Sequence, residues 1–345
     1  MKFSTPGPWL SDDGPDTDVV MSCRVRLARN IAGFPFVGRA NDAQRREILR
    51  IAQQVVLSLD LADGMFWVDL SHSPARDRQL LMERHLISRH LAEAEFPRAV
   101  AVSGDETLSI MVNEEDHLRM QVLGPGIGLS DLMDRINEVD DAIESRLDFA
   151  FSQRWGYLTA CPTNVGAGIR LSVMMHLPGL KLTGEIDRLR RAAKDLHLAV
   201  RGYYGEGSES AGDFYQVSNQ ITLGRSEQDL LAEFRDRILP QIIEYEQHAR
   251  QMLVERNPTL LDDRINRAVG ILRSAHLLGA EEAMKLLSRV RLGIRLKRLH
   301  GIDLNKVNHL LLQVQSAHLQ QSIGADLNPD QRREARAKLV REALS

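Results

Sequence analysis

Five arginines stand in short segments where polar and apolar residues alternate: Arg24, Arg26, Arg119, Arg170 and Arg201. Successive side chains of a β-strand point to opposite faces, so each arginine would occupy the polar side of a strand whose other side is buried. Taken singly, such an arginine is most often a solvated side chain on a half-exposed strand. Together they predict a sheet surface carrying up to five guanidinium groups, which repel one another unless an anion is present. A triphosphate suits this surface because guanidinium groups bind phosphate oxygens in pairs.

Acidic residues follow the strand before Arg119. The segment Asn113–His117 contains Glu114, Glu115 and Asp116 in a row. A solvated surface turn would explain this composition, but beside a phosphate site the acids can hold Mg²⁺ through oxygen ligands or shared waters, and they can pair with a guanidinium substrate. Glu206 lies in the Gly- and Ser-rich segment 202–212, which we expect to close over a substrate.

Cys161 lies in a polar loop, between Ala160 and Pro162. A lone cysteine is usually a small buried hydrophobic residue. This one precedes a proline and stands nine residues before Arg170, and a neighbouring positive charge favours the thiolate. Cys161 is therefore a candidate for the reaction site.

Two other patterns carry less weight. The segment Gly124–Gly128 is rich in glycine but lacks the Lys-Ser/Thr of a Walker loop, which favours a simple connection into the next helix. The basic run Arg289–Arg298 falls on an amphipathic pattern, which predicts a solvated helix face or, as the alternative, a docking surface for acidic partners.

Helical and strand periodicities alternate in the first three quarters of the chain. Apolar spacing predicts helices over 41–61, 80–94, 184–195 and 227–255, and one that follows Ser130 as its N-cap. Alternation predicts strands over 107–113, 118–122, 169–177 and 196–201. Asn257-Pro258 marks a break, after which the pattern is helical throughout. We therefore expect an irregular lead-in over 1–18, a catalytic domain over 19–256 and a helical domain over 257–345.

The bulk composition is that of an ordinary globular protein. The 345 residues carry 44 Lys and Arg against 47 Asp and Glu, a formal charge of −3, which argues against nucleic acid as an obligatory partner. No stretch approaches the roughly 18 apolar residues of a membrane span, and the first residues do not form a secretory signal. Two cysteines cannot build a disulfide framework. A cytoplasmic protein that does not contact membranes is the expectation.

Four segments together resemble the phosphagen kinase superfamily, in the pattern of its bacterial protein-arginine kinases. They are SCRVRLARN at 22–30, VNEEDHLRMQ at 112–121, GYLTACPTNVGAGIRLSVMMHLPGL at 156–180 and RGYYGEGSESAGDFYQVSNQITLG at 201–224. The resemblance implies an α+β fold, in which a central, mainly antiparallel sheet is flanked by helices and followed by an all-helical C-terminal domain. It also implies ATP and Mg²⁺.

The resemblance further assigns roles to individual residues. It places Glu115 and Glu206 on the acceptor guanidinium as the pair that orients and deprotonates it, with Cys161 beside them and Glu114 acting on Mg²⁺ through water. The residues it places at the nucleotide are Ser22, Cys23, Arg24, Val25, Arg26, His85, Arg119, Arg170, Leu171, Ser172, Val173, Met174, Arg201, Gly202, Tyr203, Tyr204 and Gly205.

The acceptor is expected to be an arginine side chain of a protein. Kinases of free arginine or creatine carry a helical domain of on the order of a hundred residues before the first arginine motif, which here begins at Ser22. The resemblance implies a homodimer or larger assembly, an activator protein, and a stress response in which phosphoarginine marks proteins for a Clp-type unfoldase and protease. The alternatives are a kinase of free arginine or another small guanidine, and a catalytically inactive, nucleotide-responsive adaptor.

Two positions depart from the family pattern. Cys23 replaces a serine, and a thiol among phosphate-binding arginines would be either oxidation-sensitive or a tolerated isostere. The C-terminal Arg-Asp-x-x-Arg-Ala motif, which senses phosphoarginine in the family, is represented by Arg332, Arg333, Arg336 and Ala337. Arg333 places a like charge where a carboxylate would pair with a guanidinium, which puts allosteric sensing in doubt.

Overall fold

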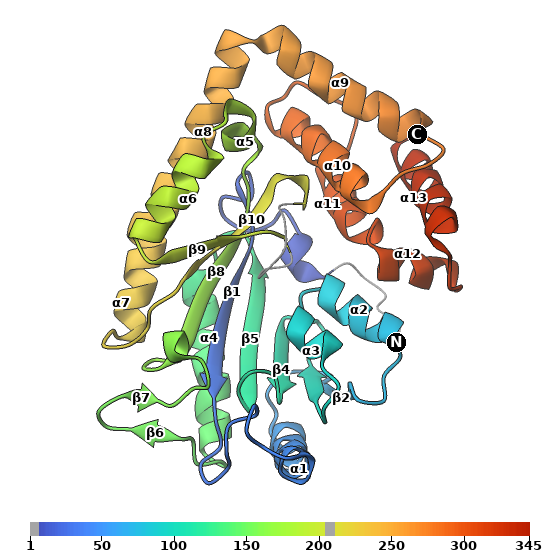
Figure 1. Cartoon of the computed structure of the whole chain (residues 1–345). Coiled ribbons are helices and arrows are strands. Elements are labelled where there is room, and N and C mark those ends of the chain that lie inside the picture. The colour runs from blue at the N-terminus through green and yellow to red at the C-terminus, as the bar shows by residue number, and fades with distance from the viewer. Residues whose placement is uncertain (1–6, 204–210) are drawn as a thin grey trace.

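A computed structural model describes residues 7–203 and 211–345 of the chain (Figure 1). At its centre is an eight-stranded sheet with the order β2-β3-β4-β5-β1-β8-β10-β9, in which every described pairing is antiparallel. The strands of this sheet are β1 (Val20–Arg29), β2 (Phe66–Asp69), β3 (Ala99–Val102), β4 (Leu108–Val112), β5 (Leu118–Pro125), β8 (Ile169–His176), β9 (Leu198–Arg201) and β10 (Phe214–Asn219). A short hairpin of β6 (Phe151–Ser152) and β7 (Gly156–Tyr157) projects beyond it.

One face of the sheet is apolar and is covered by helices. Side chains such as Val25, Leu27 and Leu171 pack there against α1 (Asp42–Ser58) and α4 (Leu129–Glu144) in the main core. The same core takes in residues of the other covering helices, which are α5 (Pro178–Thr183), α6 (Ile186–Asp195), α7 (Glu227–Ala232) and α8 (Leu239–Arg256). The expected α+β architecture is therefore present.

Two helix predictions need correction at their boundaries. Helix α4 begins at Leu129 and is capped by the backbone of Gly128, so Ser130 lies within its first turn. The helix predicted over 227–255 is interrupted by a π-helical turn (η4, Glu233–Ile238) between α7 and α8. Pro240 in the first turn of α8 has no N–H to donate to the carbonyl four residues earlier, which favours the wider turn.

The helix predicted over 80–94 is in fact two helices, α2 (Ala75–Glu83) and α3 (Arg89–Glu93). Between them His85 has a φ of 59°, a left-handed conformation that ends a helix. The Ser88 hydroxyl accepts the N–H of Leu91 and starts α3. Apolar periodicity contains no sign of this left-handed residue or of the new N-cap.

Five helices form the C-terminal part of the chain, at the upper right of Figure 1: α9 (Pro258–Ser274), α10 (Ala280–Arg295), α11 (Leu304–Gln313), α12 (Ser316–Ile323) and α13 (Pro329–Leu344). Residues of α9, α10, α11 and α13 form a second apolar core. Trp9 and Leu10, from the 3₁₀ turn η1 (Pro8–Leu10), are 1% exposed and belong to that core. The described part of the lead-in is thus packed between the sheet and the helices.

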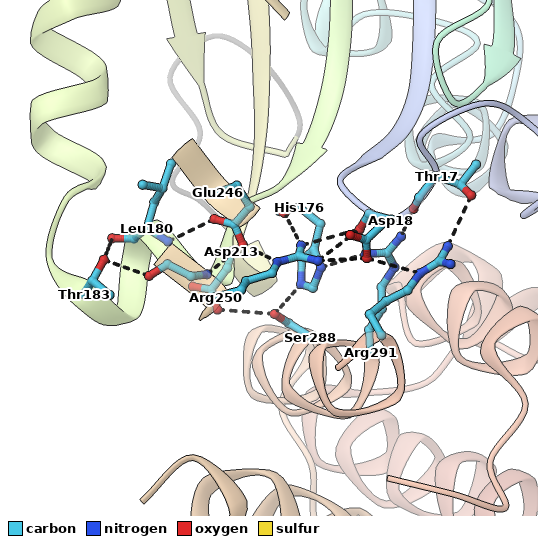
Figure 2. Close-up of polar contacts among 12 residues, drawn as sticks. Thr17, Asp18, His176, Leu180, Thr183, Asp213, Glu246, Arg250, Ser288 and Arg291 are labelled. Atoms are coloured by element: carbon cyan, nitrogen blue, oxygen red, sulfur yellow. Dashed lines mark hydrogen bonds and ion pairs between the residues drawn. The ribbon is translucent and has the colours of Figure 1, made fainter. Parts of the chain in front are cut away.

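Part of the basic run 289–298, with Arg291 at its centre, lies against the sheet and the segment before it, so its interpretation as a solvated or docking face is wrong for that part. Lys297 and Arg298, at the end of the run, are exposed. Arg291 is fully buried, and its guanidinium donates to the carbonyls of Thr17 and Asp18, to His176 Nδ1 at 2.8 Å and to Asn308 Oδ1 (Figure 2). A helical periodicity shows that a helix has a polar face, but it does not show whether that face meets water or buried carbonyls.

The same contact region extends along the end of β8. His176 Nε2 pairs with the Ser288 hydroxyl at 2.8 Å, and that hydroxyl also contacts Asp213 at 3.3 Å. Arg250 of α8 donates to the Asp18 carboxylate and to the buried Glu246 (Figure 2). Buried polar groups from the sheet, α8 and α10 are therefore paired with one another. Within the described residues no helix is long and apolar enough to cross a membrane.

Candidate active site

The five arginines of the strand pattern converge on the polar face of the sheet. Arg26 of β1 lies directly opposite Arg170 of β8, and Arg119 of β5 lies opposite Ala28, one step further along the same face. Residues paired in this way have Cβ atoms ~5 Å apart, and diagonal neighbours ~7–8 Å. Arg24 and Arg201 complete the cluster, since Arg24 is close enough to Arg119, Arg170 and Arg201 to be repelled by all three.

The positive charges of the cluster repel one another when no anion is bound. Burial, together with repulsion from Arg119, Arg170 and Arg201, lowers the pKa of Arg24 to about 9. Burial and the neighbouring guanidinium groups also hold the pKa of Arg26 well below its usual range, and its Nε is buried without a hydrogen-bond partner among the described residues. A polyanion would supply both the missing charge and the missing acceptor.

A cavity of about 350 Å³ lies over this cluster. Its floor includes four of the arginines, and its opposite wall is formed by residues between α2 and α3, with Tyr203 and Gln216 at one end. Smaller hollows beside it reach Arg170, and Ser22, Ser172 and Met174. The cavity and these hollows together are lined by most of the predicted nucleotide residues.

Four of those residues do not face the cavity. The side chains of Cys23, Val25, Leu171 and Val173 point to the other side of the sheet and are buried in the main core. Strand alternation requires this, since each stands next to a residue of the arginine face. Only their backbone is available to a ligand. Cys23 is consequently not a thiol among the arginines, and its Sγ instead accepts the N–H of Gly128 at 3.2 Å.

His85 lies at the cavity as an uncharged aromatic ring. Its ring meets those of Trp9 and Tyr203 edge-on, with centroids 4.9 and 5.1 Å away. Burial, with the positive charge of Arg24, lowers the pKa of His85 to about 3. It therefore contributes an apolar, aromatic wall and adds no charge to the cluster.

The acidic turn 113–117 joins the arginine cluster through Glu114. This carboxylate is 3% exposed, accepts Arg119 at 2.6 Å, and also accepts the Ser88 hydroxyl and the Glu115 N–H. Burial opposes its charge, but Arg119 and these hydrogen bonds prevail and lower the pKa of Glu114 to about 2. Glu114 is therefore an anion that orients Arg119, with few oxygen lone pairs left for other ligands.

Asp116 brings the cysteine loop to the same turn. Its Oδ1 accepts Asn30 Nδ2 at 2.6 Å and the N–H of Ala160 at 2.7 Å. Because Ala160 precedes Cys161 and Asp116 follows Glu115, the half-exposed thiol and the exposed Glu115 carboxylate lie in adjoining segments. The Cys161 Sγ contacts the Thr163 hydroxyl at 3.1 Å.

Sequence reasoning missed Asn30 and Ser88 as parts of the site. It grouped Asp116 with the acids that would hold Mg²⁺ or pair with a guanidinium, whereas Asp116 contacts Asn30 and the cysteine loop. Asn30 ends the first arginine motif and Asp116 lies inside the acidic turn, so their motifs contained the signal, whereas nothing local marks Ser88. Gly202 lies beside Arg201 at the end of β9, and Tyr203 lines the cavity. Tyr204, Gly205 and Glu206 lie outside the described residues.

The C-terminal arginine motif lies far along the chain, in α13. Arg336 is 2% exposed, and its guanidinium donates to the carbonyls of Val314 and Leu278. Arg333 is exposed and sits 3.7 Å from Asp330, and Arg332 donates to the carbonyl of Leu327. Ala337 is buried in the helical core. In this arrangement Arg336 holds helices together.

Comparison with known proteins shows which family the chain belongs to. The model of the ATP:guanido phosphotransferase C-terminal catalytic domain matches residues 47–249, and that of the protein-arginine kinase McsB C-terminal domain matches residues 258–345. The protein-arginine kinases of Symbiobacterium thermophilum and Halothermothrix orenii are 45% and 42% identical over 340 residues, which cover 98% of this chain and 96% of each relative. The duplicated taurocyamine kinase of Schistosoma mansoni, with bound transition-state analogue components, aligns with a TM-score of 0.63 and 26% identity over 72% of this chain and 36% of that one.

An antiparallel sheet that gathers arginines beside an acidic turn thus belongs to an enzyme of the guanidino phosphotransferase class. Identity above 40% across nearly the whole chain then places the protein in the protein-arginine kinase family of that class.

Proposed function

We propose that this protein transfers the γ-phosphoryl group of ATP to the guanidinium group of arginine side chains in other proteins. The observation that carries the proposal is the convergence of five arginines, four of which line one cavity, next to the turn that holds Glu114 and Glu115. Phosphoryl transfer requires the protein to supply little covalent chemistry. It requires that charge on the phosphates be neutralised and that the acceptor be held in line.

The nucleotide would place its phosphates on the arginine floor. The repulsion within the cluster and the unpaired Arg26 Nε suit a triphosphate, and the uncharged rings of His85 and Tyr203 suit the flat apolar base. The described residues contain no group of three or more His, Cys, Asp or Glu able to hold a metal ion. Mg²⁺ would therefore be bound mainly by the phosphates, with Glu114 near it through water.

The acceptor would approach from the side of Glu115 and Cys161. A guanidinium group stays protonated in water, with a pKa above about 12, so it is a poor nucleophile until a base takes a proton. In this proposal the exposed Glu115 orients the guanidinium and accepts that proton, with Glu206 as its partner. Since Glu115 is exposed and Cys161 half-exposed, an arginine on a protein surface can reach this side. The names of the relatives support a protein acceptor.

The test is mass spectrometry for acid-labile phosphoarginine after incubation with MgATP and either unfolded casein or free arginine. We expect phosphoarginine on casein and little phosphorylation of free arginine. The reverse result would identify a kinase of small guanidines, and no transfer to either, with nucleotide still bound, would identify an inactive adaptor.

Replacement of the two acceptor-side carboxylates tests their proposed roles. Glu115→Gln should lower turnover by roughly 10²- to 10⁴-fold, the usual contribution of a general base, while the affinity for MgADP stays nearly unchanged. Glu206→Gln should behave in the same way. A parallel loss of nucleotide affinity would contradict these roles.

The biological context that we propose rests on the family resemblance alone. Phosphoarginine would mark proteins for a Clp-type unfoldase and protease during stress in the cytoplasm, with the kinase acting as a homodimer or larger assembly under an activator protein. Degradation of casein by a purified Clp system, with and without prior phosphorylation, tests the marking role.

A further inference from the structure

The helical domain contacts one wall of the nucleotide cavity through Glu83. This residue ends α2, is 1% exposed, and its carboxylate accepts the N–H groups of Ala317 and His318 at 2.9 and 3.0 Å. These are orphan donors in the first turn of α12, and that helix has no side-chain cap of its own. Glu83 therefore caps a helix of the other domain, where its negative charge also complements the helix dipole.

His318 closes a ring around this cap. Its Nδ1 lies 2.8 Å from the Glu83 carboxylate, and its Nε2 lies 3.2 Å from the Arg84 guanidinium. Arginine can only donate, so Nε2 accepts and the Nδ1 hydrogen is directed at Glu83. Arg84 in turn forms a buried pair with Glu106, the two being 2% and 4% exposed. Two successive residues of the chain are thus fixed by α12 and by the loop before β4.

The next residues, 85–88, contribute His85, Ile87 and Ser88 to the wall of the cavity. The carbonyl of His85 accepts Gln121 of β5, and the Ser88 hydroxyl donates to Glu114 at 2.6 Å. Glu114 accepts Arg119 at the same distance. Polar contacts therefore hold the segment 83–88 at both ends, to α12 at Glu83 and to the arginine floor at Ser88, and the backbone between them joins the two.

We propose that Glu83 is a positioning residue: by capping α12 it holds the wall 85–88 over the arginines, so that the docked helical domain sets the affinity of the cavity for nucleotide. The inference rests on the proposed function in that the cavity binds a nucleotide. If only a fraction of molecules have the wall in place, the apparent Kd for nucleotide equals the intrinsic Kd divided by that fraction.

Direct binding of MgADP to the full-length protein tests this. Loss of a buried charge-assisted network should leave the wall displaced in most molecules, so Glu83→Gln should weaken MgADP binding by roughly tenfold and raise the KM for ATP. The kcat at saturating ATP and the KM for the protein acceptor should stay near their original values. His318→Ala should weaken MgADP binding as well, whereas His318→Asn, which keeps a donor near the Nδ1 position, should restore it.

The exposed pair of Arg76 and Asp326 provides a matched control. It also joins α2 to the helical domain, at 2.9 Å, but it lies on the surface. Asp326→Asn should leave nucleotide affinity unchanged. If Glu83→Gln fails to fold, His318→Ala provides the same measurement.

The inference is overturned if folded Glu83→Gln or His318→Ala binds MgADP as the original protein does, or if kcat and acceptor KM deteriorate in parallel with nucleotide affinity. If the original protein binds no MgADP, the proposed function itself fails. Failure of the inference alone is therefore recognisable, because the original protein then binds MgADP normally.

Discussion

At the scale of single residues, the arginine face stores an unfavourable interaction that a ligand relieves. Arg26 is 9% exposed and is repelled by Arg24, Arg119 and Arg170, against which the Glu114 charge is only a partial offset. Replacing a buried charged residue by an apolar one of similar size often stabilises a protein, here by roughly 1 kcal/mol or more. Arg26→Met should therefore raise the melting temperature of the ligand-free protein.

The same substitution should reduce or abolish the rise in melting temperature on adding MgADP, because it removes a phosphate-binding group. Thermal denaturation with and without MgADP measures both effects. A lower melting temperature of the ligand-free variant would mean that Arg26 is held by attractive contacts, which would contradict the repulsive character of the cluster.

The two cysteines differ in chemistry because they lie on different sides of the sheet. Burial raises the pKa of Cys23 to about 11, and its Sγ is occupied by the Gly128 N–H. The thiolate is the reactive form, so Cys23 should resist alkylation at pH 8 while the half-exposed Cys161 reacts. Peptide mapping after brief treatment of the native protein with iodoacetamide should find label on Cys161 only. Label on Cys23 in the native protein would contradict its burial, and Cys23→Ser should retain kinase activity.

At the scale of elements, strand alternation was sufficient to predict the arginine face, because a period of two fixes which side chains share a surface. The same rule, applied strictly, excludes Cys23 and Val25 from that face, which motif resemblance alone did not. Helical periodicity predicted most helices and missed the break at His85. That break depends on a left-handed residue and on contacts of the wall with Gln121, which are distant in sequence.

The buried role of Arg291 could not be predicted either, because its partners come from three other parts of the chain. Its removal should leave several buried acceptors unpaired, so Arg291→Met should lower the free energy of unfolding by roughly 3 kcal/mol. Arg298, in the same basic run, forms only a surface pair with Asp262, and Arg298→Met should leave the unfolding midpoint unchanged.

Urea denaturation of the two variants gives the comparison. Burial, together with repulsion from Arg295 and Arg250, lowers the pKa of Arg291 to about 9, so repulsion works against the hydrogen bonds. We expect the hydrogen bonds to prevail because they satisfy carbonyls that have no access to water. Equal midpoints for the two variants would show that repulsion and hydrogen bonding cancel.

At the scale of the whole molecule, the sheet and the helical domain are joined by two groups of buried polar contacts, one around Glu83 and one around His176. The first adjoins the cavity wall at Ser88, and the second adjoins Asp213 at the start of β10. The helices are therefore attached to the catalytic domain at segments next to the site. Regulation that acts on the helical domain has a physical route to catalysis through either group.

These contacts also determine how stability depends on pH. Burial, with the positive charge of Arg291 and neighbouring arginines, holds the pKa of His176 well below its usual value, and burial lowers the pKa of His85 to about 3. Above pH 6.5 both rings are neutral in the folded and unfolded chains, so they contribute no pH dependence. As the pH falls below 6.5, both rings bind protons in the unfolded chain but not in the folded chain, so the free energy of unfolding decreases. Between pH 7.5 and 5.5 the two rings should cost about 2.7 kcal/mol of unfolding free energy, at 1.36 kcal/mol each.

Urea denaturation at a series of pH values measures this loss, and His176→Gln should remove about half of it, whatever its effect on stability at pH 7.5. Buried carboxyl groups whose pKa is raised by burial, such as Asp213 and Glu246, act in the opposite direction where they titrate in this window, so the difference between His176→Gln and the original protein isolates the contribution of the ring. Burial also lowers the pKa of His117, which adds to the loss and gives it the same sign. The same pH dependence in His176→Gln and the original protein would require the ring to accept a proton in the folded protein. His176 would then stand as a cation against Arg291, and the attachment of the helical domain could not have the form seen in Figure 2.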